Sequence, residues 1–372
     1  MDPLTVFCPN MNCPARGKPN EGHIGVHSLK QRRYKCSVCQ KTFAATTGTP
    51  FYRLRHAEEL VTRVVTLLAH GCPLQAIVAA FDLDERTVAS WRDRAGAHCQ
   101  AVQENLVAVP RDLGQVQMDE LRVKQQGRIA WMALALMVST RLWLGGEVGL
   151  SRDAALIIRL VEKVRACASA LCAGLLFCTD GLKSYISAIR LVFREAVLNG
   201  QIGRPHLQAW KNIFVAQSVK QYEQGRVIDI DRRIIEGTPP DIEQMLARTQ
   251  GGGVINTAFI ERLNGTFRQC WSSLVRRGRG LARQTRTLEM GMYLVGVIYN
   301  FCWTHQSLRL AGLIGGHKWL ARTPAMAAAI TDHCWSVREL LSYQVAPAPW
   351  RPPKRRGRVS AATKQLVARW CQ

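Results

Sequence analysis

The stretch LLFCTDGLKSY, residues 175–185, joins an apolar run to an acidic residue, Asp180, at the point where the run ends. The run LLFCT has the length and composition of a buried strand, and the glycine after Asp180 favours a turn. A carboxylate at the mouth of a buried strand costs free energy unless a partner compensates its charge. Asp180 therefore either has an ordinary turn or capping role or has a partner elsewhere in the sequence.

Three extended runs precede this stretch, separated by short polar joints: QVQMDELRV (115–123), RIAWMALALMVST (128–140) and RLWLGGEVGLS (141–151). A helical stretch over residues 152–172 then leads back to the run that ends at Asp180. Consecutive extended runs with short joints pair antiparallel, whereas a strand that returns after a helix lies parallel to its neighbour. This order predicts an α/β fold with a mixed sheet, in the opening order of the ribonuclease-H type of fold.

Asp119 lies in the first of these runs, so Asp119 and Asp180 fall on adjacent strands at the centre of the predicted sheet. Two neighbouring carboxylates repel each other unless a cation joins them. Carboxylate oxygens favour Mg²⁺ or Mn²⁺, and two such ions about 3.5–4 Å apart can catalyse phosphoryl transfer. Glu261 is the candidate third acid, because Glu261, Asn264 and Arg268 share one face of a predicted helix. Its ordinary alternative is a surface helix acid.

Four cysteines form two close pairs in the first 50 residues: Cys8 and Cys13 in CPNMNC, and Cys36 and Cys39 in YKCSVCQKTF. Two such pairs, separated by a hairpin-sized segment, can bind one structural Zn²⁺ through four thiolates. Residues 1–50 are therefore predicted to form a zinc ribbon whose folding depends on the metal. Four unrelated buried cysteines are the alternative, and the other nine cysteines fit that description.

Residues 51–105 are predicted to form a helix-turn-helix domain, with short helices near 56–70, 73–81 and 84–96. Asp84 is the expected N-cap of the third helix, and Val88 and Trp91 face inward. The outward positions have the spacing of residues that read the DNA major groove: Arg86, Thr87, Ser90 and Arg94. A trihelical bundle with a solvated charged face is the alternative.

The chain carries 50 Lys+Arg against 27 Asp+Glu among 372 residues, a net charge of +23, which favours a polyanionic partner such as DNA. Seven arginines and no acid lie between Arg262 and Arg286, among them the candidate DNA contacts Arg276 and Arg277. The C-terminal end is also basic and is expected to be disordered, either as a DNA contact or as a solvated charge run. The sequence shows no signal peptide or membrane-spanning run, which predicts a cytoplasmic, nucleoid-associated protein without a membrane partner.

The ordered set of zinc ribbon, helix-turn-helix, Asp119, TDG with Asp180 and FIERLNGTFRQ with Glu261 resembles the DDE transposases of bacterial and archaeal insertion sequences, in particular the insertion-sequence-one-like family. The resemblance runs from about Cys8 to about Asp332 and includes YNFCWTHQSLR (299–309). It implies a catalytic ribonuclease-H-like domain over 112–310 and a C-terminal segment over 311–372. It also implies a homo-oligomer that cleaves terminal inverted repeats with water and joins the freed 3′-hydroxyl to target DNA.

In this resemblance Asp119, Asp180 and Glu261 hold the catalytic metal ions. Asn264 and Arg268 are the helix companions of Glu261 and candidate DNA contacts. The last two acids are 81 residues apart (261 − 180), so residues 199–255 are considered an insertion, whose Asp229 and Asp231 are rival third ligands. His305 has either an active-site role or a packing role. A non-catalytic DNA-binding regulator and a nuclease that cuts without joining remain alternative functions.

Overall fold

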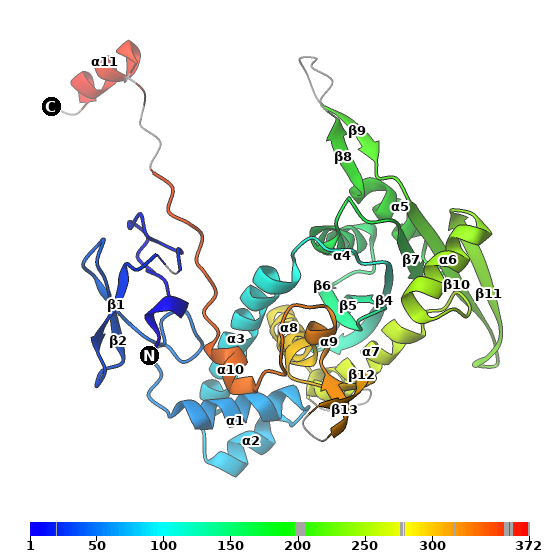
Figure 1. Ribbon diagram of the computed structural model, residues 1–372, viewed down its shortest axis with the longest axis horizontal. Helices are drawn as coiled ribbons and strands as arrows, with labels where there is room; N and C mark the ends of the chain where they lie inside the picture. The colour runs from blue at the N-terminus through cyan, green and yellow to red at the C-terminus, as the bar shows by residue number, and fades with distance from the viewer. Residues whose placement is uncertain are drawn as a thin grey trace. The chain divides into compact units, whose positions relative to one another are not determined.

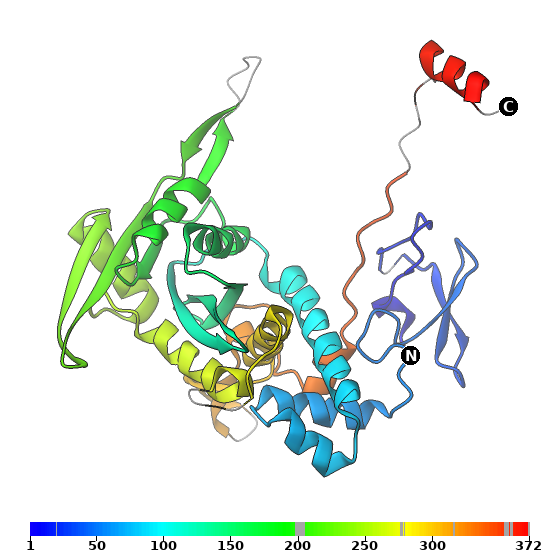
Figure 2. The same cartoon turned by 180° about the vertical axis from the view of Figure 1, so that it is seen from behind.

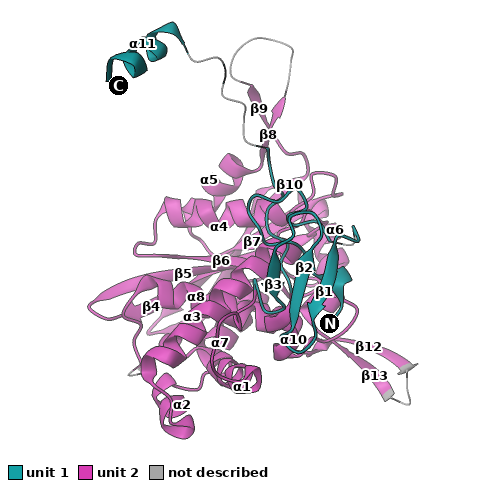
Figure 3. Ribbon diagram, turned by 90° about the vertical axis from the view of Figure 1, so that its left-hand side faces the viewer, with its two compact units in different colours: residues 1–48, 344–372 teal, residues 49–343 magenta. Residues whose placement is uncertain are grey.

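The computed structural model describes residues 1–19, 21–197, 205–275, 278, 280–314, 317–352, 357 and 360–370, with the backbone alone at 313, 314 and 317. The chain forms two compact units, residues 1–48 with 344–372, and residues 49–343 (Figure 3). The fold is mixed α/β, as the sequence predicts. No helix in these described ranges is long and apolar enough to cross a membrane.

The smaller unit contains a three-stranded antiparallel sheet in the order β1 (Ile24–Ser28), β2 (Arg33–Cys36), β3 (Thr42–Ala44), preceded by a short 3-10 helix η1 (Pro3–Thr5). Residues near 344–348 contact this part of the chain: Gln344 Nε2 donates to the Ala45 carbonyl at 3.0 Å, and Arg16 Nε donates to the Ala348 carbonyl at 3.1 Å. Beyond them, α11 (Ala361–Trp370) is helical, whereas the sequence analysis assigned no helix to the basic tail.

The larger unit is built on a six-stranded mixed sheet in the order β11-β10-β7-β4-β5-β6 (Figure 1). Its strands are β4 (Gln115–Gln125), β5 (Arg128–Met137), β6 (Leu142–Gly149), β7 (Leu175–Thr179), β10 (Ile213–Glu223) and β11 (Arg226–Glu236). Strand β7 is parallel to both β4 and β10, and the other pairs are antiparallel. The prediction that the strands of Asp119 and Asp180 are adjacent and parallel is therefore confirmed, with Gln117 opposite Cys178.

Helices cover both faces of this sheet. The adjacent glycines of β6 show the two layers, because consecutive strand residues point to opposite faces: Gly145 faces Lys163 of α4 (Ala154–Cys167), and Gly146 faces Met292 of α8 (Thr285–Phe301). Helix α5 (Lys183–Val192) packs beside α4, and α6 (Pro239–Gln250) and α7 (Ala258–Cys270) contact β4 from the α8 side. Gly296 allows α8 to approach closely, since a Cβ there would lie 2.3 Å from the Trp143 ring.

Three helices precede the sheet: α1 (Glu58–Ala69), α2 (Leu74–Phe81) and α3 (Glu85–Val102). The Asp84 carboxylate caps α3 by accepting hydrogen bonds from the Arg86 and Thr87 amides, as predicted, and Val88 and Trp91 are buried. Helix α3 continues beyond its expected end because its second half packs against α8, where a Cβ at Gly96 would lie 2.6 Å from the Met290 carbonyl. These helices thus belong to the same compact unit as the sheet.

The remaining elements are short helices and hairpins: η2 (Gln103–Val107), β8 (Arg194–Val197), β9 (His206–Ala209), η3 (Ser272–Leu274), β12 (His305–Ile314), β13 (His317–Arg322), α9 (Pro324–Ala327) and α10 (Val337–Ser342). Helix α5 ends at Val192, and the short strand β8 follows. The segment considered an insertion, 199–255, supplies β10 and β11 of the main sheet and α6, whose Ile242, Met245 and Leu246 pack in the core.

Candidate metal centres

The acidic centre lies where the two central parallel strands meet. Asp119 projects from β4, and Asp180 directly follows β7, so the strand register brings both to one region. Asp180 Oδ1 accepts a hydrogen bond from the Leu182 amide at 2.9 Å, and its carbonyl accepts one from Gln217 Nε2 at 2.9 Å. Among the described residues, one group of carboxylates has ligand oxygens within 4.8 Å of one another: Asp119, Glu120 and Asp180.

Glu120 is a member of this group that the sequence analysis missed. It follows Asp119 on the strand, so its side chain leaves the opposite face of the sheet, and it is fully buried. Arg152, just before α4, donates to Glu120 Oε2 through Nη2 at 2.6 Å and Nε at 2.9 Å. The same Nη2 lies 2.9 Å from Asp180 Oδ2, and the guanidinium lies 5.4 Å above the Trp131 ring. Arg152 therefore joins the two acids from the α4 side.

Gln117 attaches α7 to the strand that carries Asp119. Its Oε1 accepts hydrogen bonds from the Phe259 and Ile260 amides, each at 3.0 Å, and its Nε2 donates to the Asn256 carbonyl at 2.8 Å. The first amides of a helix have no partner within the helix, so an acceptor at this position satisfies them. This fully buried glutamine thus places α7 against the acidic centre.

Helix α7 brings Asn264 to Asp119, with Nδ2 donating to Oδ2 at 2.8 Å. Glu261, one turn earlier, lies outside the three-acid group and binds a lysine instead. Lys220 Nζ of β10 lies 2.7 Å from both carboxylate oxygens, and Thr257 Oγ1 donates to Oε1 at 2.6 Å. The structure therefore places the third predicted acid beside the centre, in an ion pair that sequence reasoning did not anticipate.

The electrostatics of the centre favour a cation. Burial, together with the negative charges of Glu120, Asp180 and Glu261, raises the pKa of Asp119 to about 6. Burial also raises the pKa of Glu120, although Tyr185 and Arg152 act in the opposite direction. A divalent cation would relieve this repulsion, and the carboxylate oxygens are suitable ligands for a hard cation.

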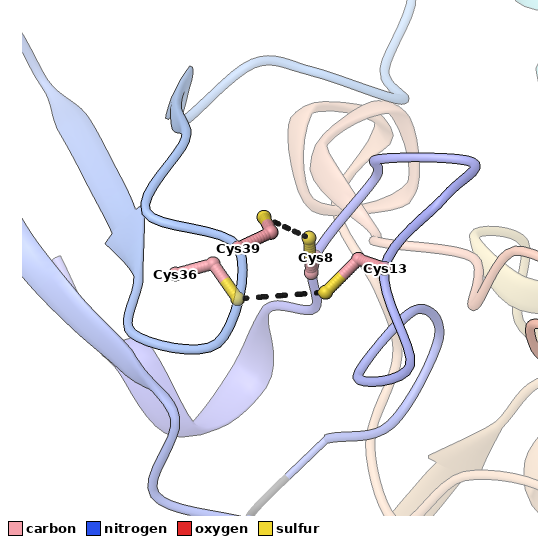
Figure 4. Close-up of side chains that lie close together, drawn as sticks. All are labelled: Cys8, Cys13, Cys36 and Cys39. Atoms are coloured by element: carbon pink, nitrogen blue, oxygen red, sulfur yellow. Dashed lines mark hydrogen bonds between the residues drawn. The ribbon is translucent and has the colours of Figure 1, made fainter.

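The four predicted cysteines form a second centre, in the smaller unit, and their gathering is confirmed (Figure 4). Cys8 Sγ lies 3.6 Å from Cys39 Sγ, and Cys13 Sγ lies 3.9 Å from Cys36 Sγ. Four sulfurs around a tetrahedral ion with bonds of about 2.3 Å would be about 3.8 Å apart. These separations therefore fit one tetrahedral metal ion.

The predicted DNA contacts of α3 differ in their surroundings. Arg86 and Ser90 are exposed, and Thr87 is half-buried. Arg94 is already engaged, because its Nη2 donates to the Tyr52 carbonyl at 2.7 Å. Three outward positions thus remain at the start of α3, and Arg94 instead ties the helix to the preceding loop.

The other candidate DNA contacts lie in different environments. Asn264 is buried, and its amide donates a hydrogen bond to Asp119. It therefore contacts an acid and does not face the solvent, from which DNA would approach. Arg268 lies half-buried in the last turn of α7. Arg276 and Arg277 lie outside the described residues.

His305 lies in an apolar and cationic environment. Its ring packs edge-on against Tyr299 with centroids 4.6 Å apart. Burial and the positive charges of Arg262 and Arg141 lower its pKa to about 4, which keeps the imidazole neutral at pH 7. The surroundings match the packing interpretation of this histidine.

The rival third acids, Asp229 and Asp231, belong to β11 and lie outside the three-acid group. Asp231 Oδ2 accepts a hydrogen bond from Arg233 Nε at 2.6 Å.

No protein-family model matches the chain, and a search of curated proteins finds no match.

Proposed function

We propose that this protein is a DDE-type DNA transposase that binds terminal inverted repeats and carries out metal-dependent strand cleavage and strand transfer. The observation that carries the proposal is the convergence of Asp119 and Asp180 on adjacent parallel strands, with α7 bringing Asn264 to Asp119 and Glu261 beside them. The strand order supports a ribonuclease-H-like core, because three antiparallel strands are followed by a helix and two parallel strands. Strand β11 is an addition to that order.

Asp119, Asp180 and Glu261 would hold two Mg²⁺ or Mn²⁺ ions. Their oxygen donors suit these hard cations, and burial together with the neighbouring acids raises the pKa of Asp119, so a bound cation would favour its ionised form. When bound, the ions activate an attacking oxygen and stabilise a leaving one in phosphoryl transfer. The same acids would serve hydrolysis and strand joining, because only the attacking oxygen differs.

The residues around the acids have positioning roles. Asn264 fixes the orientation of Asp119 by donating to Oδ2, and Gln117 fixes α7 against β4. Arg152 and Lys220 hold Asp180 and Glu261, and their positive charges would also attract the DNA phosphates. The centre thus combines acids for metal ions with cations suited to a polyanion.

DNA recognition is assigned to the N-terminal part of the chain. We interpret residues 1–50 as a zinc ribbon, whose Cys8, Cys13, Cys36 and Cys39 would hold structural Zn²⁺, and α1–α3 as a helix-turn-helix. Arg86, Thr87 and Ser90 at the start of α3 would contact double-stranded DNA, consistent with the net charge of +23. Joining two DNA ends requires both in one complex, which favours a homo-oligomer acting at the nucleoid.

The proposal can be tested with purified protein, Mg²⁺ or Mn²⁺, and labelled oligonucleotides from the DNA that flanks its gene. Wild type is compared with Asp180→Asn and Glu261→Gln. Glu162→Gln serves as a matched control, because Glu162 is an exposed acid on α4 away from the centre. We expect products longer than the input strand with wild type and Glu162→Gln only, and only with metal.

Other outcomes would identify the alternative functions. Shortened strands without longer ones would indicate a nuclease that does not join. Retarded but unaltered DNA, the same for wild type and Asp180→Asn, would contradict catalysis and indicate a DNA-binding regulator. Cleavage that survives Glu261→Gln but not Asp180→Asn would remove Glu261 from the catalytic set.

A further inference from the structure

The free edge of the main sheet is a long strand with an unusual sequence. Strand β11, RVIDIDRRIIE over residues 226–236, pairs with β10 on one side and forms the outer edge of the sheet (Figures 1 and 2). The described residues place no strand on its other side. An edge strand presents a row of backbone N–H and C=O groups that can pair with another chain.

The distal half of the β10–β11 hairpin has little support from its own chain. Strand β7 pairs with β10 only over residues 213–217, so the ribbon beyond this point is two-stranded. Three large apolar side chains are exposed on it: Tyr222 (64%), Ile228 (59%) and Val227 (47%). Because a two-stranded ribbon alone is marginally stable in water, these features favour an additional paired strand.

The charge of β11 argues against DNA as that partner. Its three basic residues, Arg226, Arg232 and Arg233, balance its three acids, Asp229, Asp231 and Glu236 (3 − 3 = 0), in a chain with a net charge of +23. A DNA-binding strand in such a chain would be expected to carry excess positive charge. A neutral strand with apolar side chains instead suits a protein edge.

We propose that β11 pairs antiparallel with β11 of a second copy, about a two-fold axis at Asp231, so that the two sheets become continuous. In this register residue i lies opposite residue 462 − i, and opposite residues share a face of the sheet. Over the regular part of the strand this register pairs Asp229 with Arg233, and at the strand ends it brings Arg226 near Glu236. Two bulges, at Ile228 and Ile235, lie between these charge pairs, where the register with β10 shifts.

The charges favour this register over a slip of one residue. The slip would place Asp229 opposite Ile234 and Val227 opposite Glu236, and would keep favourable pairs only at Ile228 with Ile235 and at Asp231 with Arg232. At the axis the two Asp231 carboxylates approach each other, and each is compensated by Arg233 of its own strand at 2.6 Å. A two-fold interface of this kind is the commonest arrangement of homo-oligomers.

The test measures the mass of the full chain in solution by light scattering after size exclusion. Wild type should form a dimer of twice 41.6 kDa. Asp229→Lys places a lysine opposite Arg233, and Arg233→Asp places an acid opposite Asp229, so each alone should raise the concentration needed for half-dimerisation by about tenfold or more. An equimolar mixture restores opposite charges at both pairs and should recover the dimer, which also shows that both variants are folded.

The control is Glu223→Lys, which reverses an exposed charge at the same end of the hairpin but on β10. It should leave the dimer unchanged. Hydrogen exchange should show β11 amides, residues 226–236, protected at high protein concentration and exposed on dilution.

Three results would overturn the proposal: a monomeric wild type at all concentrations, a dimer insensitive to both charge reversals, or single variants whose mixture does not recover the dimer. If Asp229→Lys strengthens DNA retardation and Arg233→Asp weakens it without any change in mass, the hairpin is a DNA-binding arm instead. None of these readouts depends on the proposed catalysis, so a failure here is separate from a failure of the transposase assignment.

Discussion

Replacing Gln117 with alanine should detach the start of α7 from the strand that carries Asp119. The side chain is fully buried and makes four hydrogen bonds: Oε1 accepts from the Phe259 and Ile260 amides, and Nε2 donates to the carbonyl and to Oδ1 of Asn256. In Gln117→Ala the two amides lose their acceptor inside the protein, where water cannot replace it fully. The variant therefore disturbs the helix that carries Glu261 and Asn264 without removing any acid.

The magnitude follows from these contacts. A buried hydrogen bond contributes about 1 kcal/mol net, so the four amount to about 4 kcal/mol of unfolding free energy. Gln125→Ala is the matched control, because Gln125 is a buried glutamine on the same strand whose Nε2 makes one hydrogen bond, to the Arg283 carbonyl at 3.0 Å. Its expected loss is about 1 kcal/mol.

Urea unfolding of the two variants and of wild type measures these losses. Hydrogen exchange should in addition show faster exchange at the Phe259 and Ile260 amides in Gln117→Ala and unchanged exchange there in Gln125→Ala. Equal losses for the two variants, or unchanged exchange at the start of α7 in Gln117→Ala, would refute the reasoning that this glutamine anchors the helix.

Three further predictions follow from the centres and the packing. The pKa of Asp119 is about 6 in the folded protein against its usual 3.8, so the protein loses unfolding free energy as the pH rises through 6. In urea unfolding, the unfolding free energy of Asp119→Asn should equal that of wild type near pH 4 and exceed it by up to about 3 kcal/mol at pH 7. A difference that does not change with pH would contradict this prediction. Elemental analysis of the purified protein should find one Zn²⁺ per chain. The Cys36→Ser variant should lose this ion, and its residues 1–48 should become sensitive to protease; an ion retained in the variant would exclude the four-sulfur site. Gly96→Ala should destabilise the protein by about 1–3 kcal/mol through its clash with the Met290 carbonyl, while Gly265→Ala, a helical glycine with open space around it, should stabilise it by about 0.5–1 kcal/mol; thermal unfolding compares the two.

Much of the sheet was predictable because its signals are local. The extended runs that became β4, β5, β6 and β7 are apolar, of strand length and bounded by polar joints. Their connections also determine their pairing, since short joints give antiparallel neighbours and a helix returns the chain to a parallel one. The adjacency of Asp119 and Asp180 followed from these rules.

Helix ends and helix burial were less predictable. The sequence pattern placed the N-cap Asp84 and the buried Val88 and Trp91 correctly, because capping and amphipathic spacing are properties of a few consecutive residues. It did not extend α3 to Val102, because the second half is stabilised by packing on α8, which is distant in sequence.

The basic residues that pair with the acids could not be predicted from the sequence. Arg152 reaches Glu120 and Asp180 from a loop, and Lys220 reaches Glu261 from β10, across 41 residues of chain. Glu120 left a visible signal, a second acid directly after Asp119 in MDEL, but its fully buried position opposite Arg152 became clear only in the folded chain.

By itself the sequence determined two cysteine pairs that gather in the structure, the placement of Asp119 and Asp180 at adjacent strands, and an alternation of extended and helical runs that specifies a mixed sheet. These are local properties, set by spacing and by the periodicity of apolar residues. Only the tertiary structure decided how the acids are held, with Asn264 on Asp119 and Lys220 on Glu261, and left β11 at the open edge of the sheet. The physical reason is that ion pairs, burial and strand order depend on contacts between distant segments, whose energies no local pattern contains.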